Sequence, residues 1–258
     1  MKRLSAILLT MMLVIGCTSN KSATPATMPA AIQVAKPPIV SRQEWGSKPL
    51  PINDSHKQIP KFITLHHGGV DWKPGTDPAK FVRDIQKMGQ NRVAENAKEP
   101  PQKRKANIEN WPDVPYHFMI APDGRIFEGR PVQYEPQSNT EYALQGHIGV
   151  ELMGNFETQR PSPQQLKSAV ALVAWLCQQY NIDPSQIAGH RDRAENQTVC
   201  PGKDFYRYLK DGEFVRWVKE TLAGKTPDIK PGPALAHGPT TQIPTVVNND
   251  DEEMRAKK

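Results

Sequence analysis

The sequence predicts a single α/β domain over residues 40–224, in which helices flank a central mixed β-sheet. Three observations lead to this fold class. Short apolar segments typical of strands alternate along the chain with segments of helical periodicity. Asp123-Gly124 is a two-residue turn signal, so at least one strand pair should be antiparallel. A helical segment after Ser162 carries a single apolar stripe, which has to be buried against a sheet.

The first half of the domain should contain one strand, one helix and a polar segment. Residues 61–67 are largely apolar and end at a Gly-Gly pair, which predicts a strand. A helix is expected to begin near Asp77, which can cap it, with Pro78 in its first turn. Residues 87–109 are charged and interrupted by prolines, so we expect a surface loop with room for one short helical piece.

The second half should complete the sheet and add two helices. Residues 115–122, 125–128 and 147–153 are expected to be strands, the first two forming a hairpin. Ser162-Pro163-Gln164-Gln165 has the pattern of a capping box. The apolar stripe of the helix that follows consists of Leu166, Ala169, Val170, Val173, Leu176, Cys177 and Tyr180.

Beyond this helix we expect a short strand at residues 187–189, which delivers His190. A last helix is expected over residues 203–222, with an interruption at Gly212.

The start of the chain is typical of an export signal. Residues 1–16 have a positive start followed by an apolar run, residues 7–15, that is too short to span a bilayer. Residues 13–17 resemble a bacterial lipobox, which implies cleavage before Cys17 and acylation of that residue. Because Thr18 rather than Asp follows, we expect that in a Gram-negative source the protein is a lipoprotein on the periplasmic face of the outer membrane. An ordinary signal peptide that contains a cysteine is the alternative.

Composition suggests that the flanks of the domain are not packed. Residues 17–39 are rich in Ser, Thr, Ala, Lys and Pro, so we expect a flexible tether. Residues 225–258 are rich in proline and close on an acidic run, so we expect a disordered tail.

Charge and cysteine content restrict the classes of partner. The formal net charge of +6 suits an anionic polymer or a membrane face, and we find no nucleic-acid-binding motif. With Cys17 acylated, Cys177 and Cys200 are the remaining thiols, too few for a disulfide framework. A Cys177–Cys200 bridge is an alternative that would remove a candidate metal ligand. We expect a monomer.

Two imidazoles and one thiolate form a candidate zinc site. His66 lies in Thr64-Leu65-His66-His67-Gly68, His190 in Gly189-His190-Arg191-Asp192, and Cys200 in Thr198-Val199-Cys200-Pro201-Gly202. Neutral imidazole and thiolate suit zinc, and three such ligands leave a fourth position free for water, as in hydrolytic sites. The spacing is not that of a zinc finger, so a fold has to assemble the site.

These strings resemble the zinc N-acetylmuramoyl-L-alanine amidases, which share a domain with phage lysozyme-type amidases and animal peptidoglycan recognition proteins. The resemblance runs from about Val40 to about Leu209. Besides the strings around the three donors, its landmarks are Trp45-Gly46 and the segments 111–118, 123–130 and 148–156. It implies the central mixed sheet flanked by helices that is common to that family.

The resemblance also implies roles for individual residues. Zinc (Zn²⁺) would be bound by His66, His190 and Cys200; His66 is chosen over His67 because the family places the ligand first and adjacent strand residues face opposite ways. Tyr116 and Thr198 would stabilise an oxyanion. Glu151 matches the proposed general base of the branch that recycles wall fragments, with a strand glutamate in a salt bridge as the alternative.

The implied activity is hydrolysis of the amide bond between N-acetylmuramic acid and L-alanine of the peptidoglycan stem peptide. The substrate would be peptidoglycan itself or soluble anhydro-muropeptides. The main alternative is a non-catalytic lipoprotein that binds peptidoglycan. A purely structural zinc domain would need a fourth ligand, for which His147 is the candidate. The segment 87–109 is hypothesised to form a rim of the cleft.

Overall fold

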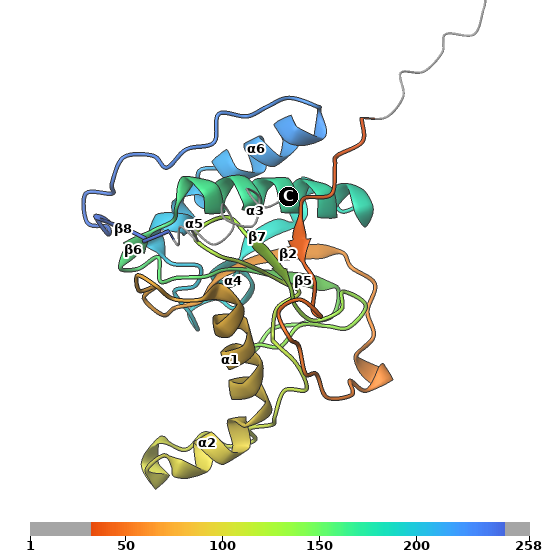
Figure 1. The fold of residues 1–258 in the computed structure, drawn as a ribbon, viewed down its shortest axis with the longest axis vertical. Coiled ribbons are helices and arrows are strands. Elements are labelled where there is room, and N and C mark those ends of the chain that lie inside the picture. The colour runs from red at the N-terminus through yellow and green to blue at the C-terminus, as the bar shows by residue number, and fades with distance from the viewer. Residues whose placement is uncertain (1–31, 246–258) are drawn as a thin grey trace, which may run out of the picture. The chain divides into compact units, whose positions relative to one another are not determined.

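A six-stranded mixed β-sheet forms the centre of the protein in the computed structural model, which describes residues 32–245 (Figure 1). The expected signal peptide, the acylation site Cys17 and the chain beyond residue 245 lie outside the described residues. The strands are β1 (Ile39–Val40), β2 (Phe62–His67), β3 (Phe118–Ile120), β4 (Ile126–Glu128), β5 (His147–Leu152), β6 (Gln159–Arg160), β7 (Ile187–Gly189) and β8 (Thr241–Gln242). The α-helices are α1 (Pro78–Gln90), α2 (Arg92–Lys98), α3 (Pro163–Gln179), α4 (His190–Arg193), α5 (Lys203–Lys210) and α6 (Glu213–Leu222), and short 3-10 turns cover Asp54–His56, Pro101–Lys103 and Pro184–Gln186.

The sheet has the strand order β1-β4-β3-β5-β2-β7. Its β3–β4 pair is antiparallel and its other pairs are parallel, which confirms the predicted mixed sheet and hairpin. Because β5, β2 and β7 are parallel neighbours, their carboxyl ends lie at one edge of the sheet. The candidate residues His66 and His190 stand at this edge.

The predicted strand 115–122 is regular only over β3. Before β3 the ladder continues as single backbone bonds, from Gly129 N to His117 O and from Arg130 N to Tyr116 O, each 2.8 Å long. The backbone of Gly129 comes so close to Tyr116 O that a Cβ atom there would overlap it. Tyr116 therefore sits at an irregular strand start.

Helix α3 covers one face of the sheet, and α6 packs beside α3 (Figure 1). Ser162 caps α3 as predicted, because its Oγ accepts from Gln165 N at 2.9 Å. The Gln165 side chain does not close a capping box. Its amide instead donates to Ile120 O and Met153 O, both at 2.9 Å, and so ties the start of α3 to the ends of β3 and β5.

The polar segment 87–109 is more helical than expected. Helix α1 runs to Gln90, and α2 follows after Asn91, so that both lead away from α3 in the lower part of Figure 1. No residue of α2 is buried, so no apolar stripe signals this helix in the sequence. The predicted interruption of the last helix is confirmed at Gly212, whose φ of 72° separates α5 from α6.

The expected tether begins to pack before residue 39, which corrects its predicted extent. Val34 N donates to Gln178 Oε1 at 2.8 Å, and Ile32 O accepts from Gln178 Nε2 at 2.7 Å. Strand β1 then joins the edge of the sheet beside β4. Residues 32–39 therefore belong to the folded domain, because the side chain of a single glutamine on α3 pairs with their backbone.

The expectation of a disordered tail is wrong for residues 226–243, which we call the C-terminal strap. Gly232 N donates to Tyr208 Oη at 3.0 Å, and β8 pairs with β6 in a small parallel sheet. Ile243 is 1% exposed and lies against Gly154, where any side chain would collide with it. Proline content predicted disorder here, but proline does not prevent an extended segment from packing at an edge.

Among the helices of the described part, we find none that is both long and apolar enough to cross a membrane.

Candidate metal centre

Three separate segments bring the predicted metal ligands together. His66 lies near the end of β2, and His190 begins α4 directly after β7, whose Gly189 is paired with Leu65. Cys200 comes from the loop before α5. One donor atom from each ligand lies within 4.8 Å of the others, and Cys200 Sγ is 3.7 Å from His66 Nδ1. The two imidazole ring centres are 4.5 Å apart.

Backbone contacts hold Cys200 in place. Its carbonyl accepts from Arg191 N at 2.8 Å, and its amide donates to Thr198 Oγ1 at 3.1 Å. The thiol sulfur accepts a weak bond from His67 N at 3.4 Å. Cys177 and Cys200 are both free, so the alternative disulfide is not formed.

The donor set suits a cation such as zinc. Burial, followed by the field of His190, lowers the pKa of His66 well below its usual value, and burial lowers that of His190 to about 4. Both imidazoles are therefore neutral at pH 7, the form that binds metals. Burial raises the pKa of the Cys200 thiol to about 12, and a nearby cation is what would favour its thiolate.

Two hydroxyl groups orient His190, and the sequence analysis did not find them. Thr140 Oγ1 lies 2.6 Å from His190 Nε2, and Ser138 Oγ lies 3.3 Å from the same atom. With Nε2 engaged, Nδ1 is the ring nitrogen available to a metal. Thr140 lies 50 positions before His190 in the chain, and neither hydroxyl belongs to a motif. No local signal in the sequence therefore points to these two residues.

Glu151 is buried beside the donors. It is paired with His66 across β5 and β2, and paired residues of neighbouring strands face the same side of a sheet. Its side chain is 0% exposed, and neither carboxyl oxygen has a hydrogen-bond partner among the described residues. Burial raises its pKa to about 8. A methyl group on Gly68 would stand 2.6 Å from Oε1, so glycine leaves room for this carboxyl group.

Tyr116 and Thr198 line the same cleft as the donors. The Tyr116 ring centre is 5.0 Å from that of His66. Burial, then the charges of Glu151 and Cys200, raise the pKa of Tyr116 well above its usual value, so the phenol keeps its proton. Thr198 Oγ1 accepts from Cys200 N, which leaves its own O–H free to donate.

The other histidines near the sheet have structural contacts. His67 Nδ1 accepts from Phe156 N at 3.1 Å. His117 Nδ1 accepts from Gly149 N at 2.9 Å, and its Nε2 lies 2.8 Å from Tyr134 O.

His147, the candidate for a fourth ligand, is paired with Phe62 at the opposite ends of β5 and β2 from the donors. Its Nδ1 bonds Thr64 Oγ1 at 2.7 Å, and it is not part of the donor cluster. That position does not support a purely structural four-ligand site.

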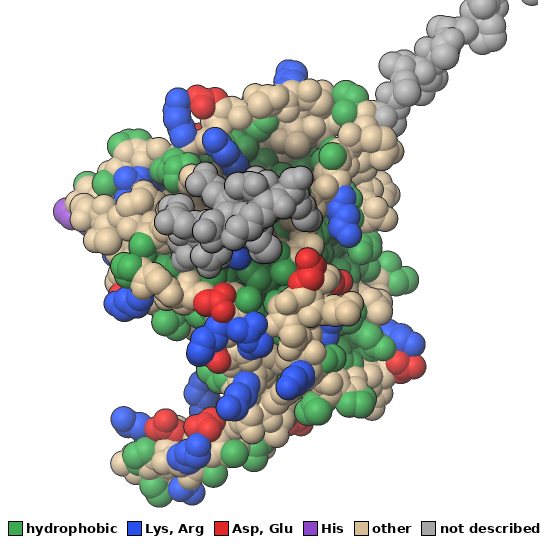
Figure 2. Space-filling model, viewed as in Figure 1, with side chains coloured by type: hydrophobic (Ala, Val, Ile, Leu, Met, Phe, Trp, Pro, Cys, Tyr) green, Lys and Arg blue, Asp and Glu red, His purple; other side chains and the backbone are tan. Residues whose placement is uncertain are grey.

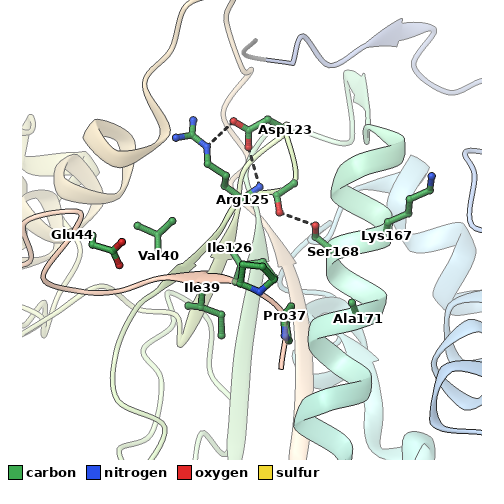
Figure 3. A pocket seen from close by; sticks show the side chains of 12 residues that line it. Pro37, Ile39, Val40, Glu44, Asp123, Arg125, Ile126, Lys167, Ser168 and Ala171 are labelled. Atoms are coloured by element: carbon green, nitrogen blue, oxygen red, sulfur yellow. Dashed lines mark hydrogen bonds and ion pairs between the residues drawn. The ribbon is translucent and has the colours of Figure 1, made fainter. Parts of the chain in front are cut away.

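The donors open into a cleft of about 390 Å³. The wall beyond them includes Ile85, Met88, Lys105 and Trp111. Of these, Met88 and Lys105 belong to the segment 87–109, so this segment does line the rim. A larger cavity of about 640 Å³ lies elsewhere, between β1, the hairpin turn and α3. In Figure 3 it is surrounded by labelled residues such as Ile39, Ile126 and Ala171, and it contains none of the metal donors.

The fold and this site together define a mixed α/β domain with a candidate His-His-Cys metal centre in an open cleft. The chain belongs to the N-acetylmuramoyl-L-alanine amidase family, whose model matches residues 56–203. Members of this family are typically zinc-dependent.

Relatives include both recognition proteins and amidases. Peptidoglycan-recognition protein LB of Drosophila melanogaster is 27% identical over 225 residues, which cover 82% of this chain and 87% of that protein. The N-acetylmuramoyl-L-alanine amidase of Sus scrofa is 26% identical over 181 residues, 67% of this chain and 27% of that protein. A mutant of Drosophila PGRP-LB, solved in complex with tracheal cytotoxin, has a TM-score of 0.52 at 25% identity and covers 67% of this chain and 92% of its own. These likenesses confirm the predicted fold class.

Proposed function

We propose that this protein is a zinc hydrolase that cleaves the amide bond between N-acetylmuramic acid and L-alanine of the peptidoglycan stem peptide. The observation that carries the proposal is the donor cluster of His66, His190 and Cys200 at the floor of a cleft. Two neutral imidazoles and a thiolate are the ligand types of hydrolytic zinc sites. A pure binding module has no need of these three donors beside an unpaired carboxyl group.

Zinc held by these three residues would supply a Lewis acid and lower the pKa of a bound water from ~15.7 towards ~7. The chain's own groups provide the remaining steps. Tyr116 keeps its proton and can donate a hydrogen bond to the oxygen that becomes negative as water adds to the lactyl carbonyl carbon. Thr198 donates a second bond through its free O–H.

Glu151 moves the proton in this mechanism. A carboxyl group with a pKa of about 8 exchanges a proton readily near neutral pH. Its carboxylate takes a proton from the attacking water and passes it to the leaving nitrogen of L-alanine, as the carbon–nitrogen bond breaks. Because Glu151 has no other hydrogen-bond partner among the described residues, no competing bond holds either of its oxygens.

The substrate is peptidoglycan or a muropeptide derived from it. The relative solved with tracheal cytotoxin supports this class of ligand. We further propose that acylation of Cys17 attaches the protein, as a monomer, to the periplasmic face of the outer membrane; this rests on the sequence alone. Such an anchor would hold the cleft beside the cell wall.

Digestion of purified sacculi tests the proposal. The full-length protein is incubated with and without zinc, and soluble products are identified by mass spectrometry. We expect zinc-dependent release of stem peptides with a free N-terminal alanine, and loss of that release in Cys200→Ser. If sacculi and soluble muropeptides are bound but never cut, the proposal is wrong, and the protein is a non-catalytic lipoprotein that binds peptidoglycan.

A further inference from the structure

We propose that Lys105 binds a carboxylate of the stem peptide and so selects substrates whose carboxyl groups are not amidated. This inference rests on the proposed function, because it says which residue binds one end of the same substrate. It concerns a residue of the helical insertion 87–109, outside the donor cluster.

The structure fixes the backbone of Lys105 and leaves its ammonium group without an ion pair. Asn96 of α2 accepts from Lys105 N at 3.0 Å and donates to Lys105 O at 2.9 Å. Lys105 is exposed, lines the cleft that contains the donors, and makes no salt bridge with any described residue. The nearby Glu95 is paired instead with Lys98 at 2.7 Å.

The other cation at this rim is already engaged. The guanidinium of Arg92 stacks on Trp111, with Cζ 3.7 Å from the ring centre, and donates to Asn139 Oδ1 at 2.8 Å. Arg92 therefore ties α2 to the loop that contains Thr140. It also covers a face of Trp111. Lys105 is the cation left for a ligand at this wall.

Figure 2 shows Lys and Arg side chains gathered over the α1–α2 part of the molecule, with acidic side chains among them. Residues 91–110 contain five Lys and Arg against three Glu, so the insertion has a small positive excess. An anionic ligand that enters the cleft past this wall is favoured over a neutral one.

The chemistry of the substrate decides which part meets Lys105. The lactyl carboxyl group of muramic acid is consumed in the amide bond that is cut, so the glycan side presents hydroxyl and acetamido groups. The stem peptide ends in a carboxylate. With the amide bond held at the donors, the carboxylate-bearing peptide is the part that complements an unpaired ammonium group along the same cleft.

Binding of the released stem peptide tests this without any need for cleavage. The dissociation constant of the free stem peptide, and of the same peptide with its carboxyl groups amidated, is measured by calorimetry with the full-length protein in the presence of zinc. We expect Lys105→Gln to weaken binding of the free peptide about ten-fold, the usual effect of one charge-assisted bond at an accessible site. Amidation should weaken binding to the unaltered protein by the same factor and should add nothing in Lys105→Gln.

Lys103→Gln is the matched control, because Lys103 lies in the same insertion and does not line the cleft. Equal binding of both peptides to the unaltered protein, or equal losses in the two variants, would overturn the inference. Failure of the proposed function is a separate result, since it appears as intact sacculi after digestion whatever the peptide affinities are.

Discussion

The two sides of the cleft differ in how their functional groups are held. On the inner side, His66, Cys200 and Glu151 are buried and fixed by strands and backbone bonds. On the rim, Lys105 of the insertion 87–109 and Asn139 of the loop that contains Thr140 are exposed. Groups fixed in a dry site stabilise developing charge without reorganising, whereas exposed groups contribute modest, screened interactions. We therefore expect the inner side to determine the rate and the rim to determine the choice of substrate.

The largest effect should come from Glu151→Gln. If Glu151 moves the proton, kcat falls by about 10²–10⁴-fold. The free energy of unfolding should stay constant or rise, because an unpaired buried carboxyl group is unfavourable. The measurements are steady-state kinetics on a soluble muropeptide, urea unfolding and zinc content. Glu141→Gln, which changes an exposed glutamate that does not line the cleft, is the control. An unchanged kcat in Glu151→Gln would leave Glu151 with a structural role.

Ile243→Ala tests how much the C-terminal strap stabilises the inner side of the cleft. The side chain fills the space over Gly154, whose carbonyl accepts from Gly69 N at 3.0 Å. Removing a fully buried isoleucine should lower the free energy of unfolding by about 2–4 kcal/mol. The exposed Thr241→Ala should leave it nearly unchanged. Equal urea midpoints for both variants would show that the C-terminal strap adds nothing to stability.

The free energy of unfolding should depend on pH through the protonation of the buried His117. Burial lowers its pKa from 6.5 to about 4, so its contribution is complete above pH 6.5 and is lost as the pH falls from 6.5 towards 4. This loss should amount to about 3–4 kcal/mol, because the pKa is lowered by about 2.5 at ~1.4 kcal/mol per pKa unit. His117→Asn should be less stable at pH 7.5, and its stability should approach that of the unaltered protein at pH 4. Urea unfolding with a chelator present measures both; parallel curves would contradict this role.

The smallest of these effects is expected at Thr140, where the loop at the rim contacts His190 on the inner side. Thr140→Val removes the hydroxyl that bonds His190 Nε2 and should weaken zinc binding by about 10–100-fold, as loss of such partners of metal ligands does. Thr140→Ser should restore most of the affinity. Competition with a chromophoric chelator gives the affinities directly, and identical values for the two variants would mean that Thr140 does not orient the ring.

The candidate site was largely predictable because its residues lie in strings with strong local signals. His66 lies near the end of an apolar strand, His190 follows a short strand, and Cys200 comes directly before Pro201-Gly202. Strand pairing then converts three distant strings into one cluster. Thr140 and Ser138 could not be predicted, since their role depends on a loop path that no local pattern specifies.

The chain ends show the limit of composition as a guide. Composition predicts a flexible tether before the domain and a disordered tail after it. Their packing depends on single residues instead, Gln178 for the N-terminal segment and Ile243 for the C-terminal strap. Likewise, α2 has no apolar stripe and no side-chain cap at its N-terminus, and it is held by polar bonds to residues outside the helix, such as that from Val93 N to Asn110 Oδ1.

The position of Ile243 also sets an order of assembly. All three metal donors have been synthesised once Cys200 is made, but the residue that fills the niche over Gly154 comes well after it in the chain. A growing chain therefore contains all three donors before Ile243 can pack against Gly154, whose carbonyl accepts from Gly69 N. We therefore expect a chain that ends before Ile243 to contain all three donors but to lack the side chain that packs over Gly154.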